Sequence, residues 1–286
     1  DTPTASTGLP PASDNCTSKP IITYVDGNFS STCPGSYSFE RVWTVSDSCG
    51  NTAATVTQNI SVEDTAKPAF TFVPGDTTLY KDGSCNADTT TASIGMATAT
   101  DNCTSKPIIT YVDGNFSSDC PGSYKFERVW TVSDSCGNTA ATRTQKVTVE
   151  DTVKPVFTFV PNDTTLYKDA GCNADTTPAR TGMATASDNC TSKPIITYAD
   201  GNFGSTCPGS YSFERVWTVK DSCGNTAATV TQNISVEDTT KPVFTFVPND
   251  TTLYKDAGCN ADTTTASTGM ATATDNCTSK PIITYV

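Results

Sequence analysis

Short segments of alternating apolar and polar residues recur along the chain and are typical of β-strands. Residues 69–73 alternate between two prolines, and residues 77–80 continue the pattern after a turn. The strongest segment is 124–132, which is predicted to place four side chains on one face: Tyr124, Phe126, Trp130 and Val132. Further strands are predicted at residues 89–98, 108–112 and 139–149. No segment keeps the helical period of 3.6, so the pattern predicts an all-β fold.

The chain repeats itself with a period of 87 residues. The stretch DNCTSKPIITY, which begins at Asp14, returns at Asp101, Asp188 and Asp275. This period is longer than that of solenoid repeats and approaches the size of an immunoglobulin-like domain. Each repeat is therefore long enough to hold its own core. The sequence predicts tandem immunoglobulin-like β-sandwich domains, joined end to end as a rod or filament.

The polar stretch at residues 62–68 carries a proline that ends a strand, and it returns at 149–155 and 236–242. Domain boundaries placed there give two complete domains, 66–152 and 153–239. They are flanked by incomplete domains: residues 1–65, which lack the first strand, and residues 240–286, which hold only the first strands. Residues 1–25 and 262–286 are the same part of the repeat, so the ends overlap. We expect a window on a longer polypeptide rather than strand donation between chains.

Composition narrows the function classes. The chain has 18 Lys and Arg against 30 Asp and Glu, a net charge of −12. Nucleic acid binding is unfavoured, because it requires a basic surface. The chain contains no His, the commonest general base and zinc ligand, so we expect no enzyme. No apolar run is long enough to span a bilayer. The first residues lack the features of a signal peptide, so an export signal is expected outside this chain.

Four motifs carry a resemblance to a known family. They are SDNC at 187–190, FERVWTV at 213–219, DSCGNTA at 221–227 and VEDTTKP at 236–242. Their combination resembles the hyalin repeat (HYR), in its four-cysteine form from very large secreted bacterial proteins. The resemblance implies an immunoglobulin-like module at the cell surface or outside the cell, with no catalytic residue to carry over. A lysine stands where that family often has a second proline in the linker, at Lys67, Lys154 and Lys241.

The cysteines are predicted to form disulfides. Each period carries four of the chain's 13 cysteines, at Cys85, Cys103, Cys120 and Cys136 in the second domain. Zinc binding is unfavoured because there is no CxxC spacing and no His, and a catalytic thiol would lack a base. Recurring cysteines in an acidic, β-rich chain favour an oxidising, extracellular setting. Four cysteines allow three connectivities.

The expected sandwich topology ranks these connectivities. Cys103 and Cys136 fall in loops at one pole of the domain, and Cys85 and Cys120 at the opposite pole. We therefore predict pairing within each repeat: Cys103–Cys136, Cys85–Cys120, Cys190–Cys223, Cys172–Cys207 and Cys16–Cys49. Cys33, Cys259 and Cys277 are left without a partner in this chain. Their partners are expected in a continuing polypeptide or in a neighbouring chain.

Acidic residues are expected to gather at the junctions between domains. Carboxylate and Asn oxygens are ligands that calcium prefers, so one hypothesis is a calcium site at each junction that stiffens the array. The first set is Glu63, Asp64, Asp101, Asn102, Asp134 and Asn138; the second is Glu150, Asp151, Asp188, Asn189, Asp221 and Asn225. The alternative is ordinary turn chemistry, in which Asp and Asn cap loops.

The recurring Asp-Thr pairs are similar to the short O-glycosylation signal of the Bacteroidota. Covalent glycans would then lie on an exposed, Thr-rich surface. The candidate acceptors are Thr65, Thr77, Thr89, Thr152, Thr164, Thr176, Thr239, Thr251 and Thr263.

Trp43, Trp130 and Trp217 are interpreted as core residues rather than sugar-stacking residues, because apolar neighbours flank them within the strand. Arg41, Arg128 and Arg215 share their nominal face, so either a bulge turns each Arg outward or the Arg pairs with a buried acid.

These observations predict a structural extracellular filament or stalk whose partners are further copies of the same repeat. The alternative is an adhesin whose repeats contact a glycan or protein directly. A third interpretation, accessory domains of an enzyme, would require catalytic sequence beyond this chain.

Overall fold

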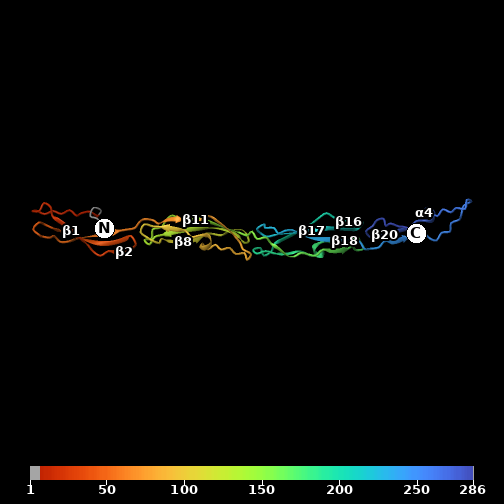
Figure 1. Cartoon of the computed structure of the whole chain (residues 1–286), viewed down its shortest axis with the longest axis horizontal. Helices are drawn as coiled ribbons and strands as arrows, with labels where there is room; N and C mark the ends of the chain where they lie inside the picture. Colours follow the sequence, from red (N-terminus) through yellow and green to blue (C-terminus); the bar gives the residue numbers. More distant parts are fainter. Residues whose placement is uncertain (1–6, 286) are drawn as a thin grey trace. The chain divides into compact units, whose positions relative to one another are not determined.

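The computed structural model describes residues 7–285, apart from the side chain of Thr206. The chain divides into two compact units. Unit 1 comprises Asp1–Leu79, Ala87–Ser118 and Tyr124–Glu150, and unit 2 comprises Tyr80–Asn86, Asp119–Ser123 and Asp151–Val286. Each unit contains parts of successive 87-residue repeats and is described by itself (Figure 1). The domain boundaries expected from the repeat stay a prediction.

The third repeat, in unit 2, shows the strand arrangement most completely. A five-stranded sheet has the order β13-β18-β17-β15, and β16 also pairs with β17. A separate two-stranded sheet pairs β12 with β14. The strands are β12 (Val156–Phe159), β13 (Thr164–Tyr167), β14 (Thr185–Ser187), β15 (Ile195–Asp200), β16 (Gly204–Cys207), β17 (Ser210–Lys220) and β18 (Val230–Glu237).

The order of these strands is that of an immunoglobulin-like sandwich. The fourth strand along the chain and the last two, β15, β17 and β18, form one antiparallel sheet, as strands C, F and G do in that fold. The first strand and the third, β12 and β14, pair in the other sheet, as A and B do. Between them β13 joins the larger sheet, running parallel to β18. The predicted class, all-β with tandem immunoglobulin-like repeats, is confirmed.

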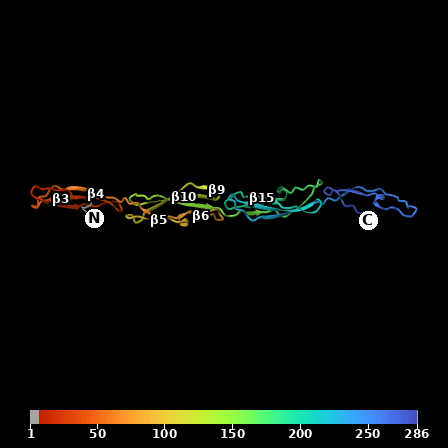
Figure 2. The ribbon, with the colours of Figure 1, turned by 90° about the horizontal axis from the view of Figure 1, so that it is seen from above.

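The second repeat, most of which lies in unit 1, has the same strand order; its strands β5, β6, β9 and β10 are labelled in Figure 2. The second repeat pairs β5 with β7 and orders its larger sheet β6-β11-β10-β8, with β9 on β10. The strands are β5 (Ala69–Phe72), β6 (Thr77–Tyr80), β7 (Thr98–Thr100), β8 (Ile108–Asp113), β9 (Ser117–Cys120), β10 (Ser123–Ser133) and β11 (Arg143–Glu150). In the first repeat β3 pairs with β1, β2 and β4; these are β1 (Ile21–Asp26), β2 (Ser30–Cys33), β3 (Ser36–Ser46) and β4 (Val56–Val62).

The fourth repeat, in unit 2, retains the smaller sheet. Strand β19 (Val243–Phe246) pairs antiparallel with β20 (Thr272–Thr274). A one-turn helix, α4 (Thr265–Thr268), lies between them in sequence, as α2 (Thr91–Ile94) and α3 (Pro178–Thr181) do in the second and third repeats.

The long central strand buries one face, as its alternation predicts. In β10, Phe126, Trp130 and Val132 are buried and Tyr124 is half-buried. Phe126 packs with Ile94 of α2 and Val147 of β11, and the third repeat has the matching cluster of Leu166, Phe213, Ile234 and Val236. The Trp residues are therefore core residues, as expected.

Each Arg on this face is buried and forms an ion pair, which decides between the two alternatives, although the side chain of its acid partner is 27% exposed rather than buried. Arg215 is 1% exposed, and its Nε and Nη2 donate to the two carboxylate oxygens of Asp200 at 2.7 and 2.9 Å. It also donates to the Thr181 hydroxyl and the Thr176 carbonyl. Arg41 with Asp26 and Arg128 with Asp113 repeat the ion pair.

The predicted strand at residues 89–98 is wrong. Asp88 accepts a hydrogen bond from the Thr90 amide, and the Thr90 carbonyl accepts from Ser93 and Ile94, which closes the helical turn α2. Gly95, at φ 97°, ends the turn, and only Thr98–Thr100 remains extended. The last strand begins at Arg143 rather than at 139, because Thr139 instead forms an isolated bridge with Ser133. The strand Ser117–Cys120 was not predicted.

Candidate functional site

The disulfides join successive repeats instead of closing loops within one repeat. The four bonds are Cys33–Cys136, Cys85–Cys190, Cys120–Cys223 and Cys172–Cys277, with Cα–Cα separations of 5.1 to 5.4 Å. The first lies within unit 1 and the other three within unit 2. The predicted pairs Cys103–Cys136, Cys85–Cys120, Cys190–Cys223, Cys172–Cys207 and Cys16–Cys49 are therefore wrong. So is the expectation that Cys33 and Cys277 lack partners in the chain.

The physical reason is that the tip of one repeat packs against the loops of the next. In unit 1 β2 ends at Cys33, and the Cys136 sulfur lies 3.4 Å from the carbonyl oxygen of Pro34 in the turn that follows. Gly35 has a φ of +89°, and a Cβ there would lie 2.6 Å from the Cys103 sulfur. The predicted pairing assigns the cysteines to two poles of a repeat, but a pole of one repeat also faces the next repeat.

The bonds follow one rule along the chain. Partners are separated by 103 residues for Cys33–Cys136 and Cys120–Cys223, and by 105 for Cys85–Cys190 and Cys172–Cys277. Five cysteines are free among the described residues: Cys16, Cys49, Cys103, Cys207 and Cys259. None of the five has another cysteine of residues 1–286 at either separation. Free Cys259 agrees with the prediction, whereas free Cys16, Cys49, Cys103 and Cys207 correct it.

Three carboxylates meet beside these cross-links in each unit. In unit 2, Asp151, Asp188 and Asp221 each offer an oxygen, and these oxygens lie within 4.8 Å of one another. Asp151 follows β11, Asp188 follows β14 and Asp221 follows β17, so three strand ends bring them together. Asp151 is 4% exposed and Asp221 is 2% exposed.

Unit 1 holds the equivalent cluster, one period earlier. Asp64, Asp101 and Asp134 again lie within 4.8 Å of one another and follow β4, β7 and β10. Asp134 is buried, and the other two are half-buried. The prediction named all three of these residues and all three in unit 2, so the structure brings together the carboxylates expected at the junctions.

Loop capping uses only part of each cluster's hydrogen-bonding capacity. Asp188 Oδ2 accepts from the amides of Cys190 and Thr191, whereas its Oδ1 is buried with no partner. Asp151 Oδ1 accepts from the Val153 amide, and its Oδ2 likewise has no partner. In unit 1, Asp101 Oδ1 and Asp64 Oδ2 are the equivalent unpartnered oxygens. Turn chemistry therefore explains one oxygen of each of these residues but not the other.

The remaining member of each cluster is held by an asparagine. Asn138 Nδ2 donates to Asp134 Oδ2 and to the carbonyl of Asp64, which ties the linker to the cluster. Burial opposes ionisation of Asp134, but hydrogen bonds from the Asn138 side chain and amide and from Cys136 outweigh it and lower the pKa. Asn225 makes the same two contacts, with Asp221 and Asp151, in unit 2.

The other predicted ligands are less buried or have other partners. Glu63 and Glu150 are exposed and are not among the grouped carboxylates, and Asn102 is also exposed. Asn189 donates to the Asp82 carbonyl, although its own Oδ1 is buried without a partner.

Repulsion between the neighbouring carboxylates makes each cluster electrostatically unfavourable. Two unit charges separated by 4.8 Å repel by about 3.5 kcal/mol at an effective dielectric constant of 20. Among the described residues, no Lys or Arg forms an ion pair with any of these six carboxylates. The cluster in unit 1 also affects Cys103: burial and the negative charge of Asp64 raise the pKa of its thiol.

The glycan candidates differ in exposure. Thr65, Thr152, Thr239, Thr251 and Thr263 are exposed, whereas Thr77, Thr89, Thr164 and Thr176 are half-buried. The hydroxyls of Thr77 and Thr164 donate to the carbonyls of Gly75 and Asn162.

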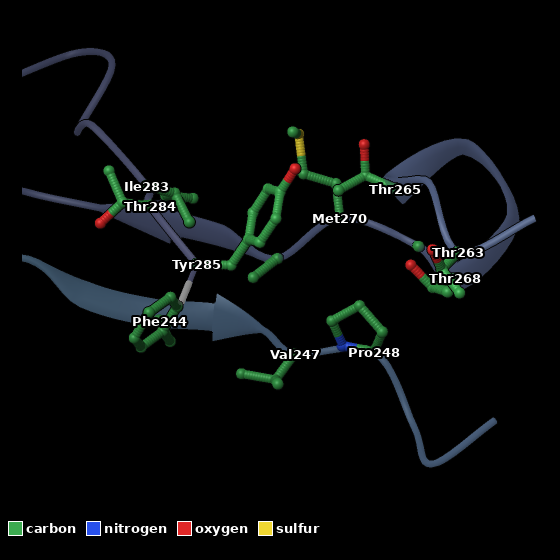
Figure 3. A pocket seen from close by; sticks show the side chains of 12 residues that line it. Phe244, Val247, Pro248, Thr263, Thr265, Thr268, Met270, Ile283, Thr284 and Tyr285 are labelled. Atoms are coloured by element: carbon green, nitrogen blue, oxygen red, sulfur yellow. The ribbon is translucent and has the colours of Figure 1, made fainter.

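A pocket in the fourth repeat is half of a repeat's interior rather than a ligand site. Phe244, Val247, Met270 and Tyr285 line it, with Thr263 and Thr268 at one end (Figure 3). One period earlier, the residues equivalent to these threonines accept hydrogen bonds from Arg215 and Gln232 of the larger sheet.

Comparison with known proteins leaves the family open. No family model matches the chain. No curated protein matches it. Solved structures with similarity include mouse clustered PcdhgC3 EC1-3 (12% identity, TM-score 0.26, 71% of this chain and 77% of that one) and Drosophila N-cadherin EC1-4 (13%, 0.22, 82% and 71%). Titin domains I67-I69 match at 10% identity and a TM-score of 0.26, over 78% of this chain and 89% of that one. These scores are low, so the fold assignment rests on the strand order. No helix in the described part of the chain is long and apolar enough to cross a membrane.

Proposed function

We propose that this chain is part of an extracellular structural filament or stalk in which each immunoglobulin-like repeat is covalently tied to the next. The observation that carries the proposal is the set of disulfides between repeats. The junction in unit 2 formed by the loops around Cys85 and Cys120 holds two bonds, one to Cys190 and one to Cys223. A bond within a repeat stabilises that repeat alone, whereas these bonds also hold the junction, which is the point where a tandem array bends.

The free cysteines support the same function. A further repeat at the same spacing would supply a disulfide partner for each of them. The partners of this segment are therefore proposed to be copies of the same repeat, in the same or a neighbouring chain. Persistent disulfides belong to an oxidising compartment, which supports a location outside the cell or on its surface. The HYR-like motifs support a bacterial surface protein of this kind, and the proposal assigns the chain no catalytic chemistry.

Peptide mapping tests the proposal directly. Cleavage before aspartate separates all the cysteines, and it releases Cys85 in residues 82–87 and Cys190 in residues 188–199. Both peptides differ in sequence from their counterparts in other repeats, so a cross-link between them has a unique mass. We expect that species from the unreduced, alkylated protein. A cross-link of 82–87 with 119–133, which carries Cys120, would instead show pairing within the repeat and would refute the proposal.

A ligand-binding adhesin is the second candidate. An open groove recurs on the larger sheet of three repeats, and in the third repeat Asn202, Glu214 and Asn233 line it. Phe203 beside it is 63% exposed. Polar side chains next to an exposed aromatic ring are suited to a glycan. Binding to a glycan array that is lost in a Glu214→Ala, Asn233→Ala variant would favour this function; no binding would leave the groove without this role.

Covalent glycans are proposed at the exposed threonines of the Asp-Thr pairs. The intact mass of the reduced native protein tests this, because hexose-sized increments above the sequence mass are expected. A mass equal to that of the sequence would exclude these glycans.

A further inference from the structure

We infer that each three-carboxylate cluster is a calcium site, and that bound calcium joins the linker of one repeat to two loops of the next. The inference goes beyond the proposed function, because the disulfides would cross-link the repeats with or without a metal ion. Burial is deepest at the cluster of Asp151, Asp188 and Asp221 in unit 2.

One carboxylate oxygen of Asp151 has no partner. The residue is only 4% exposed, and its Oδ2 accepts no hydrogen bond. A buried ionised oxygen without a partner is strongly unfavourable, and such groups in proteins are paired or coordinate metals. The Asp188 Oδ1 is the second oxygen of this kind in the same cluster. A cation between the carboxylates would satisfy both oxygens at once.

Backbone amides and the side chain of Asn225 hold the three carboxylates in place. Asp188 accepts two backbone amides at Oδ2 and Asp221 accepts two at Oδ1, so neither side chain is free to turn away. Asn225 Nδ2 donates to Asp221 Oδ2 and to the Asp151 carbonyl oxygen, at 2.7 and 3.0 Å. The cluster is therefore positioned by hydrogen bonds from both repeats.

The donor set selects the metal. All the available ligands are oxygens, and the chain has no His. Zinc and copper favour nitrogen or sulfur ligands, whereas calcium takes six to eight oxygens and accepts irregular geometry. Three carboxylates with water completing the shell suit calcium better than magnesium, which demands a near-ideal octahedron. The neighbouring sulfur of Cys190 is committed to a disulfide.

The cluster in unit 1 groups the equivalent three carboxylates with a half-buried linker residue, Asp64, but the neighbouring thiol of Cys103 is free there instead of being committed to a disulfide. In the fourth repeat, Asp275 Oδ2 is also unpartnered, but no three-carboxylate group forms there among the described residues. The full chain should therefore bind one calcium ion at each of the two clusters, and any binding at Asp275 should be weaker.

Calorimetric titration of the full, oxidised chain tests the inference. After chelation and buffer exchange, we expect calcium to bind two sites in physiological salt, in the range of about 10⁻⁴ to 10⁻³ M that is typical of extracellular modules. Asp188→Asn should abolish one of the two, because it removes a ligand charge and keeps the acceptor for the loop amides. Asp101→Asn should abolish the other, and the double variant should bind neither ion.

A matched control separates loss of a ligand from loss of a turn. Asp169 also caps a loop by accepting two amides, from Gly171 and Asn173, but belongs to neither cluster. Asp169→Asn should therefore retain both calcium ions. Circular dichroism of each variant in chelator should match the wild type, which shows that the fold survives the substitution.

Three outcomes would overturn the inference. The first is no calcium binding at millimolar concentration, and the second is an unchanged calcium stoichiometry in the Asp188→Asn, Asp101→Asn double variant. The third is that magnesium binds as tightly as calcium and that both ions are lost in physiological salt. None of these outcomes would affect the disulfide map, so failure of the calcium site and failure of the proposed function are distinguishable.

Discussion

The disulfide pattern sets how far the chain can be stretched, which gives the proposed mechanical role a quantitative test. Without cross-links, the backbone from Cys33 to Cys277 is about 245 residues long and could extend by roughly 830 Å. With the observed bonds, the shortest covalent path crosses from Cys33 to Cys136, follows the backbone to Cys172 and crosses to Cys277. That path contains about 36 backbone residues and extends by only roughly 130 Å.

Reduction should therefore release roughly 700 Å of hidden length. Single-molecule pulling of the full chain by its termini, before and after a reductant is added, measures this release. The residues outside Cys33–Cys277 contribute equally in both states and cancel. Pairing within each repeat would close the successive loops Cys16–Cys49, Cys85–Cys120 and Cys172–Cys207, which together hide about 103 residues, so reduction would release only roughly 350 Å. A release near the smaller value would refute the cross-repeat pairing.

A cysteine variant provides the control. Cys120→Ala with Cys223→Ala removes a bond that the shortest path does not use. Its limiting extension before reduction should equal that of the wild type. Cys33→Ala with Cys136→Ala removes a bond on the path, so its limiting extension should be longer.

Three further predictions concern single side chains. Asp200→Asn should lower the free energy of unfolding by about 3–5 kcal/mol in denaturant titration, because it leaves the Arg215 cation buried without its counter-ion; exposed Glu214→Gln on the same strand should change it little, and equal effects would contradict the argument. The amide and side chain of Asn233 lower the pKa of Asp163, so the stability from this contact is complete at neutral pH and is lost as the pH falls through the folded-state value; acid titration of Asp163→Asn should show a smaller loss than the wild type. Burial and Asp64 raise the pKa of Cys103, so iodoacetamide should modify it more slowly than exposed Cys259 at pH 8, and equal rates would refute this.

The sequence predicted the parts of the fold that depend on local periodicity. Alternation in residues 124–132 identified the central strand and its buried face, because burial of one face imposes a period of two. The segment 89–98 failed for a local reason: the Asp88 side chain and the Thr90 carbonyl capture amides that a strand would use. Thr-rich composition favours strands on average, but these hydrogen bonds favour a turn.

In the candidate site, the sequence predicted the grouping of the carboxylates but not the partners of the cysteines. The grouping of Asp64, Asp101 and Asp134 followed from their positions at strand ends, which topology places at one pole. The partner of Cys136 did not follow, because that bond depends on where the Cys33 turn of the preceding repeat packs. The 87-residue period carries the signal for this pairing, since near-exact repetition permits each cysteine to pair one repeat further along as well as within its own.

Because each cross-link encloses parts of two repeats, the closed loops overlap along the chain. They span residues 33–136, 85–190, 120–223 and 172–277, so every peptide bond between Cys33 and Cys277 lies inside at least one of them. A protease that cuts any one of these peptide bonds leaves both fragments attached. For a protein that works among secreted proteases, such a backbone would keep its continuity after damage that would sever a chain of separately closed domains.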